Sequence, residues 1–256
     1  MNTMLRRTTT RVAFFALLIA LWAFLANAGI WNETLFPHPL KVAATLAGGV
    51  SDGTIPNAIA VSLRRVCLGY LLSLAIGIPL GILCARKTLV EDTIGALIAG
   101  LQTLPSICWL PLALLWFGLN DRAILFVIVM GSLVSITVAV QDGVKNLPPS
   151  YVRAALTMGA RRVPLYAEVL LPASLPAILS GAKLGWAYAW RALMSGELLF
   201  VSIGLGHLLM MGRELADMSQ VLAVMLVIIG IGLFTDRLVF GNAEALVRER
   251  FGLAKA

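Results

Sequence analysis

Six long apolar stretches constrain the fold of this chain more than any other feature of its sequence. The stretches cover residues 12–29, 66–85, 93–118, 123–140, 173–200 and 219–240. A helix needs about 20 apolar residues to cross the hydrocarbon core of a bilayer, and each stretch reaches or approaches that length. The stretches lack the short alternating pattern of barrel strands, and a helix satisfies its own backbone hydrogen bonds in lipid. The sequence therefore predicts an all-α membrane protein with about six transmembrane helices, forming a single domain over residues 1–256.

The composition agrees with a chain that lies mostly in lipid. Hydrophobic residues make up 59% of the sequence and charged residues 13%, and the mean hydropathy is +0.90. The net charge of +7 comes from basic residues at the ends of apolar stretches, and not from a basic stripe with interleaved aromatic residues. This distribution indicates membrane topology and argues against nucleic acid as a partner.

The positions of the basic residues predict the orientation of the chain. An N-terminus on the cytoplasmic side places most Lys and Arg residues inside, as the positive-inside rule requires. Arg64 and Arg65 are exceptions, because this orientation places them on the opposite side. Six spans return the chain to its starting side, so both termini are predicted to be cytoplasmic.

The first apolar stretch fits two roles. Arg6 and Arg7 precede it, and it ends in Ala26-Asn27-Ala28, a pattern like a signal-peptidase site. Cleavage would leave five spans. We favour a retained span, because proteins with several spans commonly keep their first helix.

Glycine and proline residues mark where helices should touch or bend. The segments 77–81 and 181–185 both have the GxxxG spacing, which lets two helix backbones approach closely. Pro79, Pro105 and Pro111 should kink or interrupt their helices. Outside the spans, short surface helices are expected at residues 39–50 and within 204–218.

A polar segment separates the fourth and fifth apolar stretches, and its sequence has helical features. Ser150 is a candidate N-cap for a helix over 151–158, and Gly159 supplies a turn. Pro164 restarts a second helix through Val169, and Leu171-Pro172 leads into the fifth span. The segment 143–172 thus predicts a helix-turn-helix, with Arg161 and Arg162 as basic residues on the cytoplasmic side.

At this segment the sequence resembles the inner-membrane permease subunits of bacterial ATP-binding-cassette (ABC) importers. Their cytoplasmic signature reads E-A-A, three residues, G, nine residues, I-x-L-P. Here Arg153-Ala154-Ala155 is followed by three residues, Gly159, nine residues, and Val169-Leu170-Leu171-Pro172. The spacing agrees, and the departures are Arg153 for glutamate and Val169 for isoleucine.

The resemblance covers roughly residues 57 to 250. Further stretches look like the branch that serves nitrate, aliphatic sulfonates, taurine and bicarbonate; they are "SLRRVCLGYLLSLAIGIPLGIL", "LPSICWLPLALLWFGL", "GWAYAWRALMSGELL" and "GLGHLL". Related permeases also serve pyrimidine-type vitamin precursors, so that substrate class stays open beside the anions.

The resemblance implies a type I ABC importer permease fold in which residues 150–172 form a coupling helix, seated in a groove of a separate ATPase subunit. The coupling residues would be Arg153, Ala154, Ala155, Gly159, Val169, Leu171 and Pro172. Exposed Ala154 and Ala155 would let the helix lie deep in the groove. Arg153 departs from the glutamate of the family, so its contact must differ, and an acidic ATPase residue is one candidate.

The resemblance also implies the partners of the chain. They are two ATPase subunits that carry ATP and Mg, a second copy of the permease in a homodimer, and a periplasmic or lipid-tethered substrate-binding protein, all at the inner membrane. This chain itself has no phosphate-binding G-x-x-x-x-G-K-[ST] motif, because "GILCARKT" lacks the second glycine at the required position. We therefore expect no cofactor in this chain and no enzymatic activity of its own.

Three charged residues, Lys183, Arg191 and Glu197, lie inside the fifth apolar stretch. A charge at the bilayer centre costs about 2.5–3.5 kcal/mol on insertion scales, so each residue needs a partner, water or a function. Arg191 and Glu197 are six positions apart and cannot pair within one helix. Arg191 could face the translocation path and bind an oxyanion, or it could form an interhelical salt bridge. Glu197 and Trp190 are candidates for the path or its gate, and Glu197 better suits the fixing of helices.

Two other classes fit the sequence less well. A self-contained secondary transporter or channel would need internal repeats and ion ligands near the middle of the membrane, and neither is evident. A membrane-embedded enzyme would need a cluster of catalytic or metal-binding residues, and no such spacing occurs.

Overall fold

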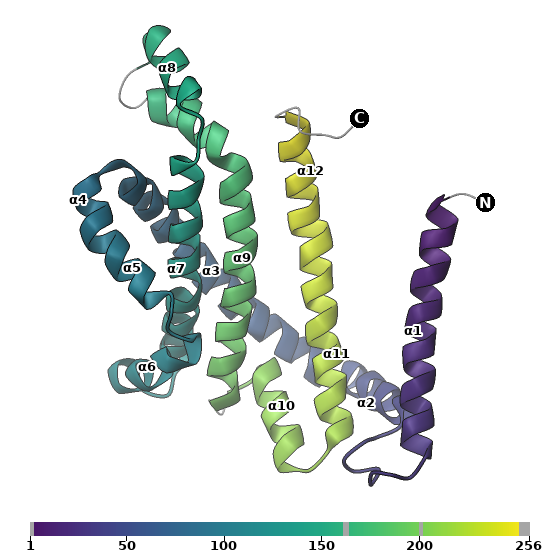
Figure 1. Ribbon diagram of the computed structural model, residues 1–256. Helices are drawn as coiled ribbons and strands as arrows, with labels where there is room; N and C mark the ends of the chain where they lie inside the picture. The colour runs from purple at the N-terminus through teal and green to yellow at the C-terminus, as the bar shows by residue number, and fades with distance from the viewer. Residues whose placement is uncertain (1–2, 161–163, 200–201, 251–256) are drawn as a thin grey trace. The chain divides into compact units, whose positions relative to one another are not determined.

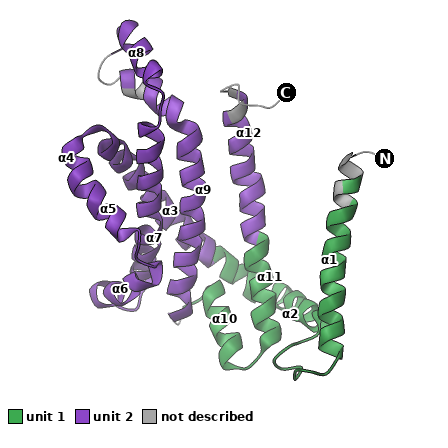
Figure 2. Ribbon diagram, in the orientation of Figure 1, with its two compact units in different colours: residues 1–60, 202–230 green, residues 61–201, 231–256 purple. Residues whose placement is uncertain are grey.

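Helices form the regular structure throughout the part of the chain that the structure describes. This computed structural model describes residues 3–160, 164–199 and 202–250 (Figure 1). The chain divides into two compact units, which are coloured separately in Figure 2. Unit 1 contains residues 1–60 and 202–230, and unit 2 contains residues 61–201 and 231–256.

Unit 1 is built from short and long helices joined by loops. It holds α1 (Thr3–Asn27), α2 (Pro39–Ser51), the start of α3 (Thr54–Arg86), α10 (Leu205–Glu214) and the first part of α11 (Met218–Phe234). α2 begins after His38, whose Nδ1 accepts a hydrogen bond from the Leu40 N–H at 3.3 Å. Pro39 occupies the first turn, where a missing N–H costs the helix nothing. The two short helices predicted outside the spans are therefore present, as α2 and α10.

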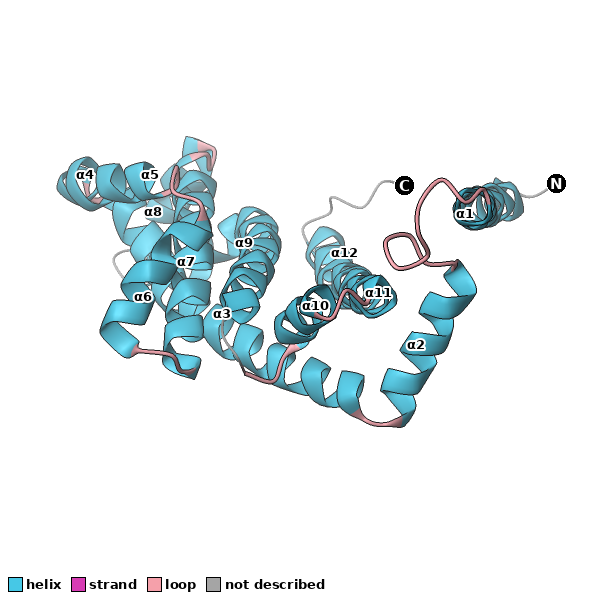
Figure 3. Cartoon of the chain, turned by 90° about the horizontal axis from the view of Figure 1, so that it is seen from below, coloured by secondary structure: helices cyan, strands magenta, loops and turns pink. Residues whose placement is uncertain are grey.

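Unit 2 contains the remaining elements. They are the rest of α3, α4 (Thr88–Val90), η1 (Glu91–Gly95), α5 (Ala96–Leu101), η2 (Ser106–Trp109), α6 (Leu110–Phe117), α7 (Asp121–Lys145), α8 (Pro149–Thr157), η3 (Leu165–Leu170), α9 (Leu171–Leu199), the end of α11, η4 (Thr235–Phe240) and α12 (Gly241–Arg250). Colouring by secondary structure shows helices and loops, and no strand occurs within the described ranges (Figure 3). The all-α prediction is confirmed.

Five described helices are long and apolar enough to cross a membrane, and a bent pair of segments makes up to six. The predicted span at 93–118 is the bent pair: Thr88–Leu101 and Ser106–Phe117 meet at 103°. It is therefore not one straight helix. Pro105 lies at the break, because it cannot donate the next helical hydrogen bond. Pro111 instead starts α6, and α3 continues through Pro79.

α7 is the centre of unit 2, because α3 and α9 both pack closely against it. α7 and α9 run side by side in Figure 1. A Cβ atom added at Gly81 of α3 would lie 2.6 Å from the carbonyl oxygen of Thr137, and one at Gly181 of α9 would collide with Ala139. The glycines of the two GxxxG segments therefore lie at helix contacts, as their spacing predicts.

Candidate functional site

The segment after α7 contains a helix that ends in a glycine turn. α8 begins at Pro149, with Pro148 at the N-cap position and no side-chain cap, so the predicted N-cap role of Ser150 is wrong. At the other end, the Gly159 N–H donates to Leu156 O at 3.1 Å and the Ala160 N–H donates to Ala155 O at 3.0 Å. These two bonds form a Schellman motif, which needs a left-handed residue at Gly159, where φ is +87°.

The surface of α8 differs from the predicted one. Arg153 and Ala154 are exposed, but Ala155 is buried. The prediction that both alanines are exposed is therefore wrong for Ala155, because α8 packs against η3. The larger side chains Tyr151, Leu156 and Met158 are exposed, and the exposed fraction of Met158 is 86%.

The second helix of this segment is not separate from the fifth span. Helical backbone from Pro164 passes through η3 into α9 without a break. Pro172 lies in the first turn of α9 and cannot donate a hydrogen bond to the residue four positions earlier, and η3 has the wider π-helical pattern immediately before it. Val169 and Pro172 are half-buried, Leu171 is exposed, and Arg161 and Arg162 lie outside the described residues.

A buried ion network joins three helices of unit 2. Glu197 of α9 is fully buried, and its carboxylate accepts hydrogen bonds from Ser62 Oγ at 2.9 and 2.7 Å. Arg65 of α3 donates to Glu197 Oε1 at 2.9 Å and to Asp121 Oδ1 at 2.6 Å, at the start of α7. Arg64 also lies 3.3 Å from Asp121. The Arg64-Arg65 pair, an exception to the orientation rule, therefore has carboxylate partners.

Lys183 also has carboxylate partners. Its Nζ lies 2.7 Å from Asp236 Oδ1 in η4 and 3.5 Å from Glu244 Oε1 in α12. These ion pairs offset the free-energy cost of placing a charged lysine within the fifth span.

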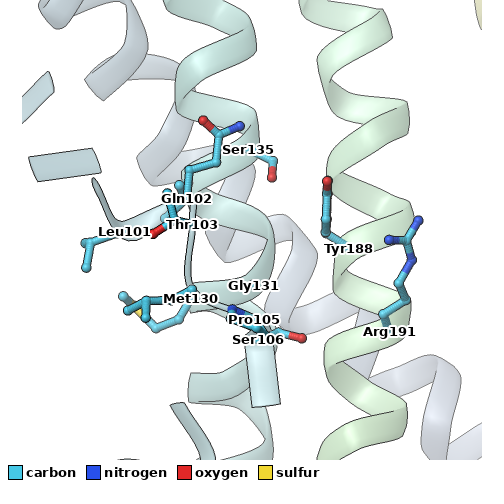
Figure 4. A pocket seen from close by; sticks show the side chains of 12 residues that line it. Leu101, Gln102, Thr103, Pro105, Ser106, Met130, Gly131, Ser135, Tyr188 and Arg191 are labelled. Atoms are coloured by element: carbon cyan, nitrogen blue, oxygen red, sulfur yellow. The ribbon is translucent and has the colours of Figure 1, made fainter. Parts of the chain in front are cut away.

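Arg191 lines a cavity of about 310 Å³ in unit 2. The wall comes from the break between α5 and η2, from the middle of α7 and from α9, as Figure 4 shows. The polar residues of the wall are Gln102, Thr103, Ser106, Ser135, Tyr188 and Arg191. The remaining residues of the wall are Leu101, Leu104, Pro105, Met130, Gly131 and Val134.

The charge of this cavity wall is carried by Arg191. Its side chain is exposed, and its guanidinium carbon lies 5.0 Å from the centroid of the Tyr188 ring. The cavity wall contains no carboxylate, and no acidic side chain in the described part of the chain forms a salt bridge with Arg191. The arrangement therefore offers a positive charge and hydrogen-bond donors to whatever enters.

The three path or gate candidates lie in different surroundings. Arg191 lines the cavity, Glu197 belongs to the ion network, and Trp190 packs on the apolar core with its ring stacked 6.3 Å from that of Trp186. Sequence reasoning missed the other polar wall residues. Gln102 and Thr103 beside Pro105 were a usable signal, because polar residues next to a proline within a span mark a possible break.

The fold and the cavity define a class of protein. A domain of several apolar spans with a broken helix beside a polar cavity is typical of membrane transport proteins. The chain belongs to the family of binding-protein-dependent transport system inner membrane components, whose model matches residues 77–242.

Curated relatives agree with this family. The chain is 35% identical to a putative ABC transporter permease of Methanocaldococcus jannaschii, over 89% of this chain and 86% of that protein. It is 29% identical to the taurine transport system permease protein TauC of Escherichia coli, over 87% of this chain and 83% of that protein. It is also 29% identical to the nitrate import permease protein NrtB of Leptolyngbya laminosa, over 96% of this chain and 90% of that protein.

A solved structure supports the fold. A chain of the MetNI methionine ABC transporter, in an inward-facing conformation, matches with a TM-score of 0.67 and 16% identity, over 77% of this chain and 95% of that chain. The protein is therefore a multi-pass permease subunit of an ABC importer with the type I fold. It is a component of a transporter, and not an enzyme.

Proposed function

We propose that this permease carries a small anionic solute of the sulfonate, taurine, nitrate or bicarbonate type along a path that includes the Arg191 cavity. The observation that carries this proposal is an arginine in the wall of a cavity that has other polar side chains and no carboxylate among its described residues. The names of similar permeases, which specify taurine, nitrate and aliphatic sulfonates, support the same class of solute.

The chemistry of the wall favours an anion. A guanidinium can donate two parallel hydrogen bonds to an oxyanion, and hydroxyl and amide groups can donate further bonds. The attraction between the guanidinium and an anion is stronger in an apolar membrane domain than in water, because the surroundings screen the two charges less. A cation would meet repulsion from Arg191 and would find no carboxylate in the wall.

We further propose that residues 150–172, within the segment 143–172, couple the permease to a separate ATPase. In this proposal Arg153 pairs with an acidic residue of the ATPase, while exposed Tyr151, Leu156 and Met158 supply apolar contact area. Gly159 fixes the end of the helix that is inserted. Val169 of η3 and Leu171 and Pro172 at the start of α9 follow that helix in the chain, and α9 carries Arg191.

The proposed assembly contains two copies of this chain and two ATPase subunits that bind ATP and Mg. A periplasmic or lipid-tethered binding protein delivers the solute. Both termini face the cytoplasm in this arrangement, as the distribution of Lys and Arg favours.

Neutralising Arg191 tests the anion path. In vesicles containing the full transporter, Arg191→Gln should weaken anion uptake roughly 10- to 100-fold, because hydrogen bonds to charged groups contribute about 1.5–3 kcal/mol. Arg122→Gln is the matched control, since Arg122 is exposed on α7 and lies outside the cavity wall. Unchanged uptake by Arg191→Gln, or transport of a neutral pyrimidine in preference to every anion, would contradict the proposal.

Changing Gly159 tests the coupling. A Cβ at this position would meet nothing within 4 Å, so a substitution acts through the left-handed backbone and not through crowding. Gly159→Val should uncouple the complex, with ATP hydrolysis retained and uptake lost, because a β-branched residue disfavours this conformation. Gly159→Asn should retain uptake, since asparagine tolerates it. Normal uptake by the valine variant would exclude a coupling role for this turn.

A further inference from the structure

We propose that Tyr188 positions Arg191 and makes the cavity selective for anionic head groups with three oxygen atoms over carboxylates with two. This inference rests on the proposed anion path and adds the residue that sets its specificity. The two residues are three positions apart on α9 and therefore share a face of the helix. Both line the cavity, and Figure 4 shows their side chains next to each other.

The Tyr188 ring limits the freedom of the Arg191 guanidinium. An exposed arginine has many rotamers, and a flexible cation loses entropy when it binds an anion. The guanidinium carbon lies 5.0 Å from the ring centroid, within the range of a cation–π contact. No carboxylate of the described chain pairs with Arg191, so the Tyr188 ring is the side-chain contact that can limit the motion of the guanidinium. Its cationic donors therefore remain available for an anion.

The Tyr188 hydroxyl has a different role from that of another tyrosine in the same unit. Tyr70 of α3 is buried, and its hydroxyl donates a hydrogen bond to the Ala182 carbonyl oxygen at 2.8 Å. The Tyr188 hydroxyl has no such protein partner among the described residues, and its side chain lines the cavity. Tyr188 is half-buried at the cavity and no acceptor in the described part of the protein takes its hydroxyl hydrogen, so this donor is available to a bound solute.

The Arg191 guanidinium and the Tyr188 hydroxyl together can distinguish head groups with three oxygen atoms from those with two. A guanidinium engages two oxygens of an anionic head group through parallel N–H bonds. A third oxygen, present in a sulfonate or nitrate and absent from a carboxylate, can then accept the hydrogen bond of the phenol. A carboxylate bound in this way has its remaining lone pairs on the same two oxygens, and it has no third oxygen to place farther from the guanidinium, toward the phenol.

Ethanesulfonate and propanoate provide the test, because they differ in the head group and have the same two-carbon alkyl part. Equilibrium binding of each radiolabelled anion is measured on the purified full-length permease in lipid nanodiscs, at constant ionic strength and without a binding protein. The wild type should prefer ethanesulfonate. Tyr188→Phe keeps the ring and should lower the affinity for ethanesulfonate about tenfold, leaving that for propanoate unchanged. Tyr188→Leu removes the ring and should weaken binding of both anions.

The controls distinguish a failure of the anion path at Arg191 from a failure of the role of Tyr188 alone. Tyr70→Phe should leave the ratio of the two affinities unchanged, since that hydroxyl bonds to backbone. If Arg191→Gln binds both anions as the wild type does, the anion path itself is wrong. If Arg191→Gln loses binding while Tyr188→Phe and Tyr188→Leu behave as wild type, only the role of Tyr188 is wrong. Equal losses for both anions in Tyr188→Phe, or a wild type without preference, would also overturn the specificity.

Discussion

Two arginines in the spans of unit 2, Arg65 and Arg191, have opposite surroundings. The side chain of Arg65 is only 5% exposed and lies 2.6 Å from Asp121 and 2.9 Å from Glu197. Arg191 is exposed on the cavity wall, and its described contact is with the Tyr188 ring. The same chemical group is paired with two carboxylates in one place and, in the described part of the chain, has none beside it in the other.

The difference indicates what each charge does. Taking a charge out of water is costly, and the cost is recovered only when opposite charges and hydrogen bonds surround it. Arg65 meets that condition, and its partners lie on α7 and α9, so it joins three helices. Arg191 has no carboxylate beside it within the described ranges. This suits a site in which the bound anion supplies the opposite charge.

Removing Arg65 should produce the largest loss of stability. Arg65→Met leaves the buried Glu197 carboxylate without its cation, and breaking a buried pair in this way costs about 3–5 kcal/mol. Reversible unfolding of the purified protein in mixed detergent measures the loss. The double variant Arg65→Met/Glu197→Leu should recover most of it, because no isolated buried charge remains. If the single variant is as stable as the wild type, the network does not hold the helices.

Adding a methyl group at Gly181 should have an intermediate effect. Gly181→Ala places a Cβ against Ala139 of α7, and overpacking of this kind costs about 1–3 kcal/mol. Gly230→Ala is the matched control, because a Cβ there meets nothing within 4 Å. The control should stabilise α11 by up to about 1 kcal/mol, since alanine favours a helix over glycine. The same unfolding assay compares them, and a stable Gly181→Ala would show that α7 and α9 can separate at little cost.

Arg191→Gln should have the smallest effect on stability, within about 0.5 kcal/mol, because the arginine is exposed and no carboxylate depends on it. The expected loss is in anion uptake alone. Unfolding and uptake are therefore measured on the same preparation. A loss of stability near that of Arg65→Met would end the distinction between the two arginines and make Arg191 a structural residue.

Much of the fold could be predicted from the sequence because its signals are local. Apolar stretch length predicts the helices, and the glycine spacing predicts the contacts at Gly81 and Gly181. Pro105 marks the break, although the 103° angle depends on packing against other elements. Ala155 was assigned to the wrong environment, because α8 packs against η3 and that packing joins residues on either side of a turn.

The candidate site could be predicted only in part. Arg191 and Glu197 stand out as charges in an apolar span, but the partners of Glu197 lie more than 130 residues earlier in the chain. No periodic pattern links residues at that separation. Ser135 and Tyr188 are single polar residues within long apolar runs, and their shared cavity exists only after three elements pack together.

The break between α5 and η2 has a consequence for the hydrogen bonds that the cavity wall can offer. The N–H groups of Gln102, Thr103 and Leu104 all donate to carbonyls of the preceding turns, while Pro105 has no amide hydrogen. The chain therefore bends by 103° in an apolar domain without an unpaired N–H group at residues 102–105. The Gln102 side chain, and not the backbone of these residues, is then the donor that the corner can present to a solute.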